Sequence, residues 1–263
     1  QFTLAGNAVI QSSGKYGSSF NNAAADNNAT LVFASTADLT FAGTGVRSLT
    51  LGGTSIGDNM LRLRLRNNPN ASEALSLTKA DGGLWILNPS SANTYSGVTT
   101  INGGILSVAK LADGAASSSI GASAATAANL RLGNGTTLQY TGTGQDTNRL
   151  FTINGTAAGD SATLDASGTG AINFTGLGSL AYGTGAQTRT LILAGTSTAN
   201  NTLAAAIGNN GTGGAVSVTK NDAGKWILSG TNGYTGDTTV NGGTLLVNGS
   251  LASANTNVSS TAT

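Results

Sequence analysis

The sequence has no cysteine and no histidine among its 263 residues. Without cysteine it can form neither disulfide bridges nor thiolate metal sites, and without histidine it lacks the commonest metal ligand and general base. Charged residues make up 9% of the chain, and the formal net charge is +1. A charge this close to zero exerts no long-range attraction on nucleic acid. The sequence therefore predicts no metal, no other cofactor and no nucleic-acid partner.

Proline and long apolar runs are scarce as well. The chain has 2 prolines, and no apolar run reaches the roughly 18 residues that a membrane-spanning helix needs. Aromatic residues make up 5%, too few for one large core. Glycine is abundant, with 39 residues, but it follows no collagen period, and 39% hydrophobic residues exceed what a disordered tract contains. This composition is typical of many short strands joined by tight turns around a narrow core.

Most of the sequence pattern of residues 75–108 recurs in residues 216–247. Because alternate residues of a strand point to opposite faces, a buried face should change less between the two copies than an exposed one. Leu84 becomes Lys225 and Val98 becomes Asp237, which places these positions on the outer face. The positions that stay apolar are the predicted structural core, and they are Trp85, Leu87, Ile101, Leu106 and Val108 with their counterparts Trp226, Leu228, Val240, Leu245 and Val247.

The two copies share the order T-K-x-x-x-G-x-W-x-L, then N-x-Y-x-G-x-T-T, a β-branched residue, N-x-G and an apolar strand. The second copy, which reads VSVTKNDAGKWILSGTNGYTGDTTVNGGTLLV, closely resembles the autotransporter-associated β-strand repeat of giant bacterial surface proteins. The first copy departs from this pattern where Asn88-Pro89 replaces Ser-Gly. The resemblance implies a parallel β-helix in the exported passenger region of such a protein, at the cell surface or outside the cell.

The fold predicted for the whole chain is all-β, a right-handed parallel β-helix (β-solenoid) that forms one elongated domain of stacked coils. We expect a first, partial repeat unit over residues 1–128 and a second unit over residues 129–263, continuous with the first. The first unit is longer around residues 14–28, which predicts a loop that leaves the solenoid, as insertions in repeat proteins usually do. Each coil should take about 20 to 25 residues.

Residues 61–66 alternate leucine and arginine, so Arg62, Arg64 and Arg66 should form a ladder on the outer face. Guanidinium groups grip carboxylate and phosphate, which makes these residues candidates for contact with an anionic partner such as a surface glycan. The alternative is a solvated face whose like charges discourage unwanted strand pairing. The second unit has no charge at the corresponding positions, so the ladder is a local feature.

Carboxylates number 11, including a single glutamate, and they are scattered mostly through turns. A polysaccharide-cleaving β-helix needs clustered carboxylates, so catalysis is not predicted. The sequence instead predicts a non-enzymatic, extracellular stalk, fibre or adhesin segment whose copies stack or continue end to end. The alternatives are a carbohydrate-binding adhesin, which would use the arginine ladder or residues 14–28, and the less favoured polysaccharide-cleaving enzyme.

Overall fold

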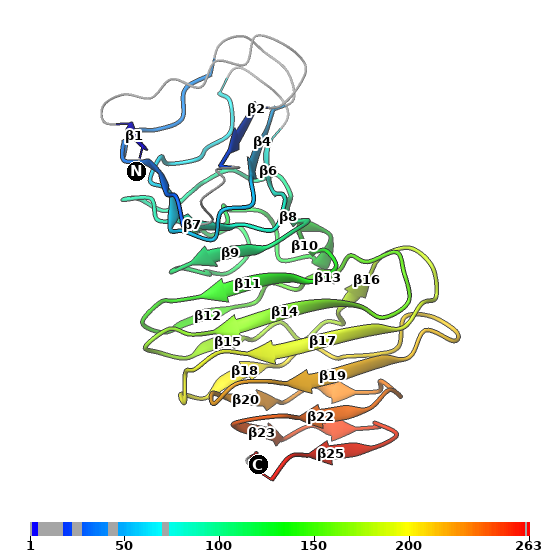
Figure 1. Ribbon diagram of the computed structural model, residues 1–263. Coiled ribbons are helices and arrows are strands. Elements are labelled where there is room, and N and C mark those ends of the chain that lie inside the picture. The colour runs from blue at the N-terminus through cyan, green and yellow to red at the C-terminus, as the bar shows by residue number, and fades with distance from the viewer. Residues whose placement is uncertain (1, 5–17, 23–27, 42–46, 70–73, 261) are drawn as a thin grey trace.

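The computed structural model describes residues 2–4, 18–22, 28–41, 47–69, 74–260 and 262–263. Over these ranges the chain winds into coils that stack along one axis from the N-terminus to the C-terminus (Figure 1). Every pair of neighbouring strands is parallel. This confirms the predicted parallel β-solenoid.

The strands gather into three main sheets, one on each face of the solenoid. The largest sheet, here the long face, contains β1 (Phe2–Leu4), β3 (Leu31–Phe33), β5 (Asn59–Leu61), β7 (Leu84–Leu87), β9 (Ile105–Val108), β11 (Thr136–Tyr140), β14 (Asp160–Ala166), β17 (Arg189–Ala194), β19 (Val216–Lys220), β22 (Thr238–Val240) and β25 (Thr256–Val258). It runs without interruption through both predicted repeat units.

The second face belongs mainly to the N-terminal coils and the third to the C-terminal coils. The second face contains β2 (Ser18–Asn21), β4 (Arg47–Gly52), β6 (Leu75–Lys79), β8 (Thr99–Ile101), β10 (Leu130–Leu132), β13 (Thr152–Ile153) and β16 (Ala181–Tyr182). The third face contains β12 (Gln145–Thr147), β15 (Ile172–Phe174), β18 (Asn201–Leu203), β20 (Lys225–Leu228) and β23 (Thr244–Val247). A two-stranded sheet pairs β21 (Thr231–Asn232) with β24 (Ser250–Leu251), and a 3-10 turn, η1, spans Ala127–Asn129.

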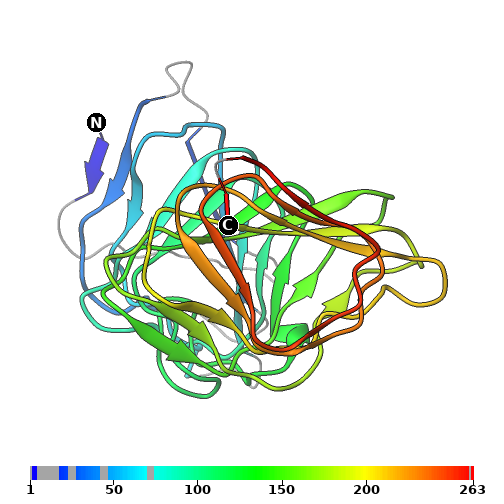
Figure 2. The same cartoon turned by 90° about the horizontal axis from the view of Figure 1, so that it is seen from below.

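The coils wind around a common axis, as the view along the stack shows (Figure 2), and the buried apolar side chains form the core inside them. Burial alternates along the strands, so that β6, β11 and β19 each read buried, half-buried, buried. Alternation of this kind is what a strand with one face on the core and one in water requires. Phe33 of β3 stacks on Trp85 of β7 with ring centroids 6.2 Å apart, a contact inside the core between coils that flank the one containing β5.

The two sequence copies lie on different faces of the solenoid. In the first copy, β6 is on the second face and the tryptophan strand β7 is on the long face. In the second copy, β19 is on the long face and the tryptophan strand β20 is on the third face. The motif therefore alternates between the second and long faces in the first copy and between the long and third faces in the second, so it is not tied to one corner of the solenoid.

Coil length varies more than the sequence predicted. Side-chain hydrogen bonds between neighbouring coils join residues 28 apart at Asn93 and Leu65, but only 18 apart at Asn255 and Asp237. The strands stay short and regular while the turns absorb the difference. Constant strand spacing with variable turns is what a backbone hydrogen-bond ladder imposes on a solenoid.

The loop expected over residues 14–28 is corrected in part. Ser18–Asn21 forms strand β2, which pairs in parallel with β4, so these residues belong to a coil. Phe20 lies 4.0 Å from Phe33 between ring centroids, and this apolar contact holds the strand on the core. Residues 14–17 and 23–27 lie outside the described residues.

Candidate functional site

The tryptophan of each copy ties its coil to the preceding one. Trp85 is fully buried and donates its indole N–H to the carbonyl oxygen of Gly52 at 2.9 Å. Trp226 is 1% exposed and donates to the carbonyl oxygen of Ala194 at the same distance. A buried indole N–H needs such a partner, because leaving it unpaired costs free energy. Neither ring is available for stacking on an external sugar.

The lysine of each copy is buried and caps a turn. Lys79 and Lys220 are both fully buried, and each donates from Nζ to three backbone carbonyls. For Lys79 these carbonyls belong to Ala80, Asp81 and Gly103. For Lys220 they belong to Asn221, Asp222 and Gly242. Burial lowers the pKa of Lys79 to about 8, against the opposing effect of the Asp81 carboxylate, and lowers the pKa of Lys220 in the same way.

The aspartates that follow these lysines bridge one turn to the next. Asp81 and Asp222 adopt φ values of 57° and 59°, a left-handed conformation that Asp tolerates better than most residues. Their Oδ2 atoms accept hydrogen bonds from the backbone N–H groups of Gly53 and Gly195 at 2.8 and 2.9 Å. These carboxylates therefore serve turn geometry.

The tyrosine and the threonine four residues later form a buried pair in both copies. The hydroxyl of Tyr95 lies 2.7 Å from Thr99 Oγ1, and the hydroxyl of Tyr234 lies 2.7 Å from Thr238 Oγ1. Both tyrosines are fully buried, and burial raises the pKa of each phenol. The glycine between them is required by close packing, because a Cβ at Gly236 would lie 2.4 Å from the carbonyl oxygen of Val216.

Residues 77–108 and 218–247 match the family described as Passenger-associated-transport-repeat. This chain carries two passenger-associated transport repeats. The autotransporter resemblance drawn from its residues is thereby confirmed.

The passenger-associated repeats occur within a longer stretch of similarity. The chain is 43% identical over 228 residues to the Adhesin BmaC autotransporter of Brucella suis biovar 1 (strain 1330). The match covers 86% of this chain and 6% of that relative, so the chain spans a small part of the relative's length. No solved structure is significantly similar to the chain. The repeats and the relative support a cell-surface or extracellular location, as the sequence predicted.

The structure places most of the predicted core residues in the observed core. Trp85 pairs in register with Leu106, and Leu87 pairs with Val108, across β7 and β9. The corresponding pairs of the second passenger-associated repeat join β20 to β23. The residues that are at most 3% exposed are Trp85, Leu87, Ile101, Leu106, Val108, Trp226, Leu228 and Val240.

Two predicted core positions of the second repeat are more exposed than the others. Leu245 is half-buried, and Val247 is 37% exposed. β23 is the last strand of the third face, and among the described residues no further strand of that sheet covers it. Leu245 is better buried than Val247, because its backbone N–H donates to the carbonyl oxygen of Thr263 at 2.7 Å and Thr263 therefore lies beside it. Both positions correspond to inward positions of the first repeat.

The arginine ladder faces outward while Leu61, Leu63 and Leu65 are buried. Two of its three members are already paired within the chain. Arg64 Nη1 lies 3.3 Å from Asp38 Oδ1, and Arg66 Nη1 lies 3.6 Å from Asp38 Oδ2. Arg62 is exposed. The shared aspartate reduces the charge that the ladder offers to an anionic partner, and such a contact stays a prediction.

The sequence did not predict the structural roles of the buried Arg149 and Arg189. Arg149 is 2% exposed, and its guanidinium holds the excursion formed by residues 109–126. It donates to the carbonyl oxygens of Ala112, Gly121 and Ser123, at 2.9, 2.9 and 3.0 Å, among others. Arg189, 1% exposed, donates in the same manner to Ala157 and Gly155 at 2.7 and 2.8 Å. Arg189 of the second unit corresponds to Arg47 of the first, and this recurrence could have indicated a structural role. Nothing in the sequence distinguishes Arg149.

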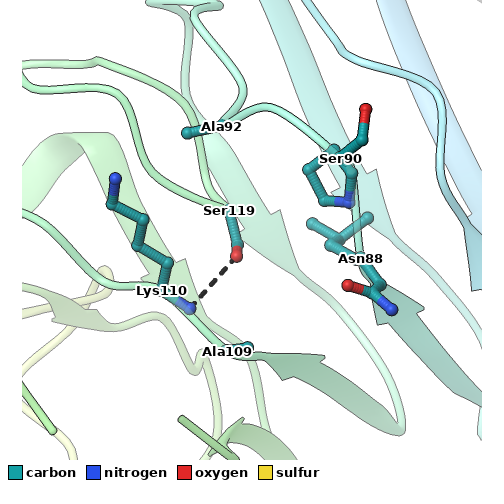
Figure 3. A pocket seen from close by; sticks show the side chains of 8 residues that line it. Asn88, Ser90, Ala92, Ala109, Lys110 and Ser119 are labelled. Atoms are coloured by element: carbon teal, nitrogen blue, oxygen red, sulfur yellow. Dashed lines mark hydrogen bonds between the residues drawn. The ribbon is translucent and has the colours of Figure 1, made fainter. Parts of the chain in front are cut away.

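Candidate metal ligands do not converge in the part of the chain that the structure describes. Within the described ranges, no three Asp, Glu, His or Cys side chains form a group that could hold a metal ion. The part of the chain that the structure describes also holds no helix with the length and apolar character that crossing a membrane requires. The concave feature that combines polar and apolar side chains beside the first repeat is a cleft between Asn88 and Lys110 (Figure 3).

Proposed function

We propose that this chain is a non-enzymatic structural segment of an autotransporter-like surface protein, a rod that adds length and carries binding elements at a distance from the cell. The observation that supports this most is that the side chains of the motif point into the solenoid. Trp226 and Lys220 donate to backbone carbonyls of neighbouring coils, at Ala194 and Gly242, and Tyr234 pairs its hydroxyl with Thr238 inside the core. A motif built this way stabilises the stack and leaves the outer surface free to vary.

The carboxylates support a non-enzymatic role. Asp81 and Asp222 accept hydrogen bonds from turns, and Asp38 forms ion pairs with two arginines. A glycoside-cleaving pair would place two carboxyl groups across one cleft with different environments. The relative's name describes an adhesin, which agrees with a binding rather than a catalytic role for the protein that contains the segment.

The proposal extends to assembly. Val247 is 37% exposed and Val258 is 52% exposed, on β23 and β25, which are the last strands of their sheets in the part of the chain that the structure describes. Apolar side chains and open strand edges of this kind favour a further coil, supplied by continuation of the solenoid or by a second copy. The small share of the relative that this chain covers favours continuation.

Electron microscopy of chains with one, two and three head-to-tail copies of residues 1–263 tests the rod directly. Eleven strands on the long face, at about 4.8 Å per strand, predict that each copy adds roughly 50 Å to one straight particle. Separate beads joined by bends would overturn the proposal. An assay for reducing ends released from neutral and acidic polysaccharides tests the non-enzymatic part, for which no release is expected.

A further inference from the structure

The first passenger-associated repeat has a cleft beside it that the repeat pattern does not require. The cleft has a volume of about 220 Å³ and lies between the turn after β7 and the start of the 109–126 excursion. Figure 3 places Lys110 on one side and Asn88 and Ser90 on the other, with Ser119 between them. Ala92 and Ala109 add apolar surface.

Both walls are departures from the second repeat. After Leu228 the second repeat turns through Ser229-Gly230, whereas after Leu87 the first has Asn88-Pro89 and a loop that is two residues longer. After Val108 the first repeat continues into the excursion, which places Leu111 and Ile120 in the core, before reaching η1. The second repeat forms its coil with the shorter turn, so stacking does not require the longer turn that carries Asn88 and Ser90.

The walls are held by hydrogen bonds rather than by chance contact. Ser119 N donates to the carbonyl oxygen of Lys110 at 2.9 Å, and Lys110 N donates to Ser119 Oγ at 3.2 Å. Asn93 forms an antiparallel bridge with Ser118 and donates from Nδ2 to the carbonyl oxygen of Ser119 at 2.7 Å. Arg149 fixes the far side of the same excursion. A cleft fixed in this way loses little entropy when it binds a ligand.

The lining combines three kinds of group. Pro89, Ala92 and Ala109 offer apolar surface, Asn88 and Ser90 offer exposed amide and hydroxyl groups, and Lys110 offers an ammonium. Among the described residues, no carboxylate forms an ion pair with Lys110. The volume falls below the 300 to 1,000 Å³ of sites for drug-sized molecules, so the cleft suits one ring of a larger chain.

We propose that this cleft binds a carboxylated sugar, one uronate-type residue within an acidic glycan. Lys110 would pair with the carboxylate, Asn88 and Ser90 would bond to ring hydroxyls, and Pro89 and the alanines would pack against the C–H face of the ring. A phosphate should bind less tightly than a carboxylate, because the cleft offers a single ammonium group and no guanidinium that could form a bidentate pair. This ligand proposal rests on the proposed surface function in one respect. It requires the cleft to be exposed to the solution outside the cell.

The test is a titration of the whole chain, followed by NMR and calorimetry, with a tetrasaccharide of alternating glucuronate and N-acetylglucosamine. We expect saturable binding with shifts at residues 88–92 and 109–119, and binding at least tenfold weaker for the same tetrasaccharide with its carboxyl groups reduced to alcohols. Inorganic phosphate should not displace the sugar. Equal binding of the reduced sugar, displacement by phosphate, or no binding at millimolar concentration would each overturn the assignment.

Variants locate the site. Lys110→Ala changes an exposed side chain and should weaken binding at least tenfold without altering the thermal midpoint. Asn88→Ser with Pro89→Gly places the second repeat's Ser-Gly at these two positions and should weaken binding as well. The matched control is Arg62→Ala, which removes an exposed cation on another part of the surface and should leave binding unchanged. A loss for Arg62→Ala equal to that for Lys110→Ala would show diffuse charge attraction and contradict the assignment. Failure here would leave the rod's measured length unaffected.

Discussion

Trp226 donates its indole N–H to the carbonyl oxygen of Ala194, 2.9 Å away in the preceding coil. The ring thus fills the core and pairs a backbone group that no strand of its own coil reaches. Trp85 does the same with Gly52 on a different corner of the solenoid. The identity of these two contacts on different faces shows that the passenger-associated repeat describes how one coil is fixed to the next.

Replacing Trp226 with alanine should reduce the free energy of unfolding by about 4 kcal/mol, because it leaves a large cavity and an unpaired buried carbonyl. The matched control is Leu246→Ala on the outward side of the next strand, where the side chain is 38% exposed and the cost should stay below about 1 kcal/mol. Urea unfolding followed by circular dichroism measures both. Similar costs for the two variants would contradict the inward role of Trp226.

Tyr234 and Thr238 should behave as a coupled pair. Tyr234→Phe leaves Thr238 Oγ1 buried without this partner and should cost about 1 to 2 kcal/mol. A cycle that adds Thr238→Val should give a coupling energy of about 1 kcal/mol. Strictly additive losses in the unfolding free energies would show that the hydrogen bond contributes nothing.

Stability should fall at alkaline pH because of the buried tyrosines. Burial raises the pKa of Tyr95 and Tyr234 above the ordinary value of about 10. Their contribution is therefore complete below pH 10 and is lost as the pH rises, since the unfolded chain releases phenolic protons that the folded chain retains. Each tyrosine should remove about 1.4 kcal/mol per pH unit above pH 10.

Unfolding free energies at pH 8, 10 and 11 check this slope. Tyr95→Phe should lower stability at pH 8 but decline less steeply between pH 10 and 11, whereas Leu246→Ala should keep the slope of the unchanged chain. An unchanged slope in Tyr95→Phe would mean that this phenol ionises equally easily in both states.

Gly236 should not tolerate a side chain. A Cβ there would lie 2.4 Å from the carbonyl oxygen of Val216, so Gly236→Ala should destabilise the fold by about 2 kcal/mol or more. Gly233 is the control, because a Cβ there meets nothing within 4 Å, and Gly233→Ala should change stability by less than about 1 kcal/mol. Thermal melts of the two variants should differ clearly, and equal melts would contradict the close packing.

The sequence was sufficient to predict the parallel solenoid because the passenger-associated repeat appears twice. Comparing the copies separated inward from outward positions, and it found Trp85, Leu87 and their partners without any structure. It misassigned Val247 because exposure there depends on whether another coil lies above, which a strand pattern does not contain. It also expected residues 18–21 in a loop, since a short polar segment does not reveal that Phe20 packs on Phe33.

The candidate site was less predictable than the fold. Lys110 and Asn88 are ordinary surface residues in the sequence, and the excursion and the longer turn bring them to one cleft. Arg149 lies far along the chain from the excursion that it holds, so no local pattern connects them. The arginine ladder was recognised from its alternation, but Asp38 becomes its partner only when neighbouring coils stack.

The central claim is that the second repeat unit stacks directly on the first, and one cross-link tests it. Thr100 on β8 and Arg131 on β10 pair in register across the boundary between the units and point outward. Neighbouring strands lie about 4.8 Å apart, within the Cα separation that a disulfide accepts, and the chain has no cysteine of its own to interfere. Mild oxidation of Thr100→Cys with Arg131→Cys should give a nearly complete intramolecular disulfide by mass spectrometry, while Thr100→Cys with Thr202→Cys, on another face, should give none. Free thiols in the first pair, or equal cross-linking in both, would contradict the stacked solenoid.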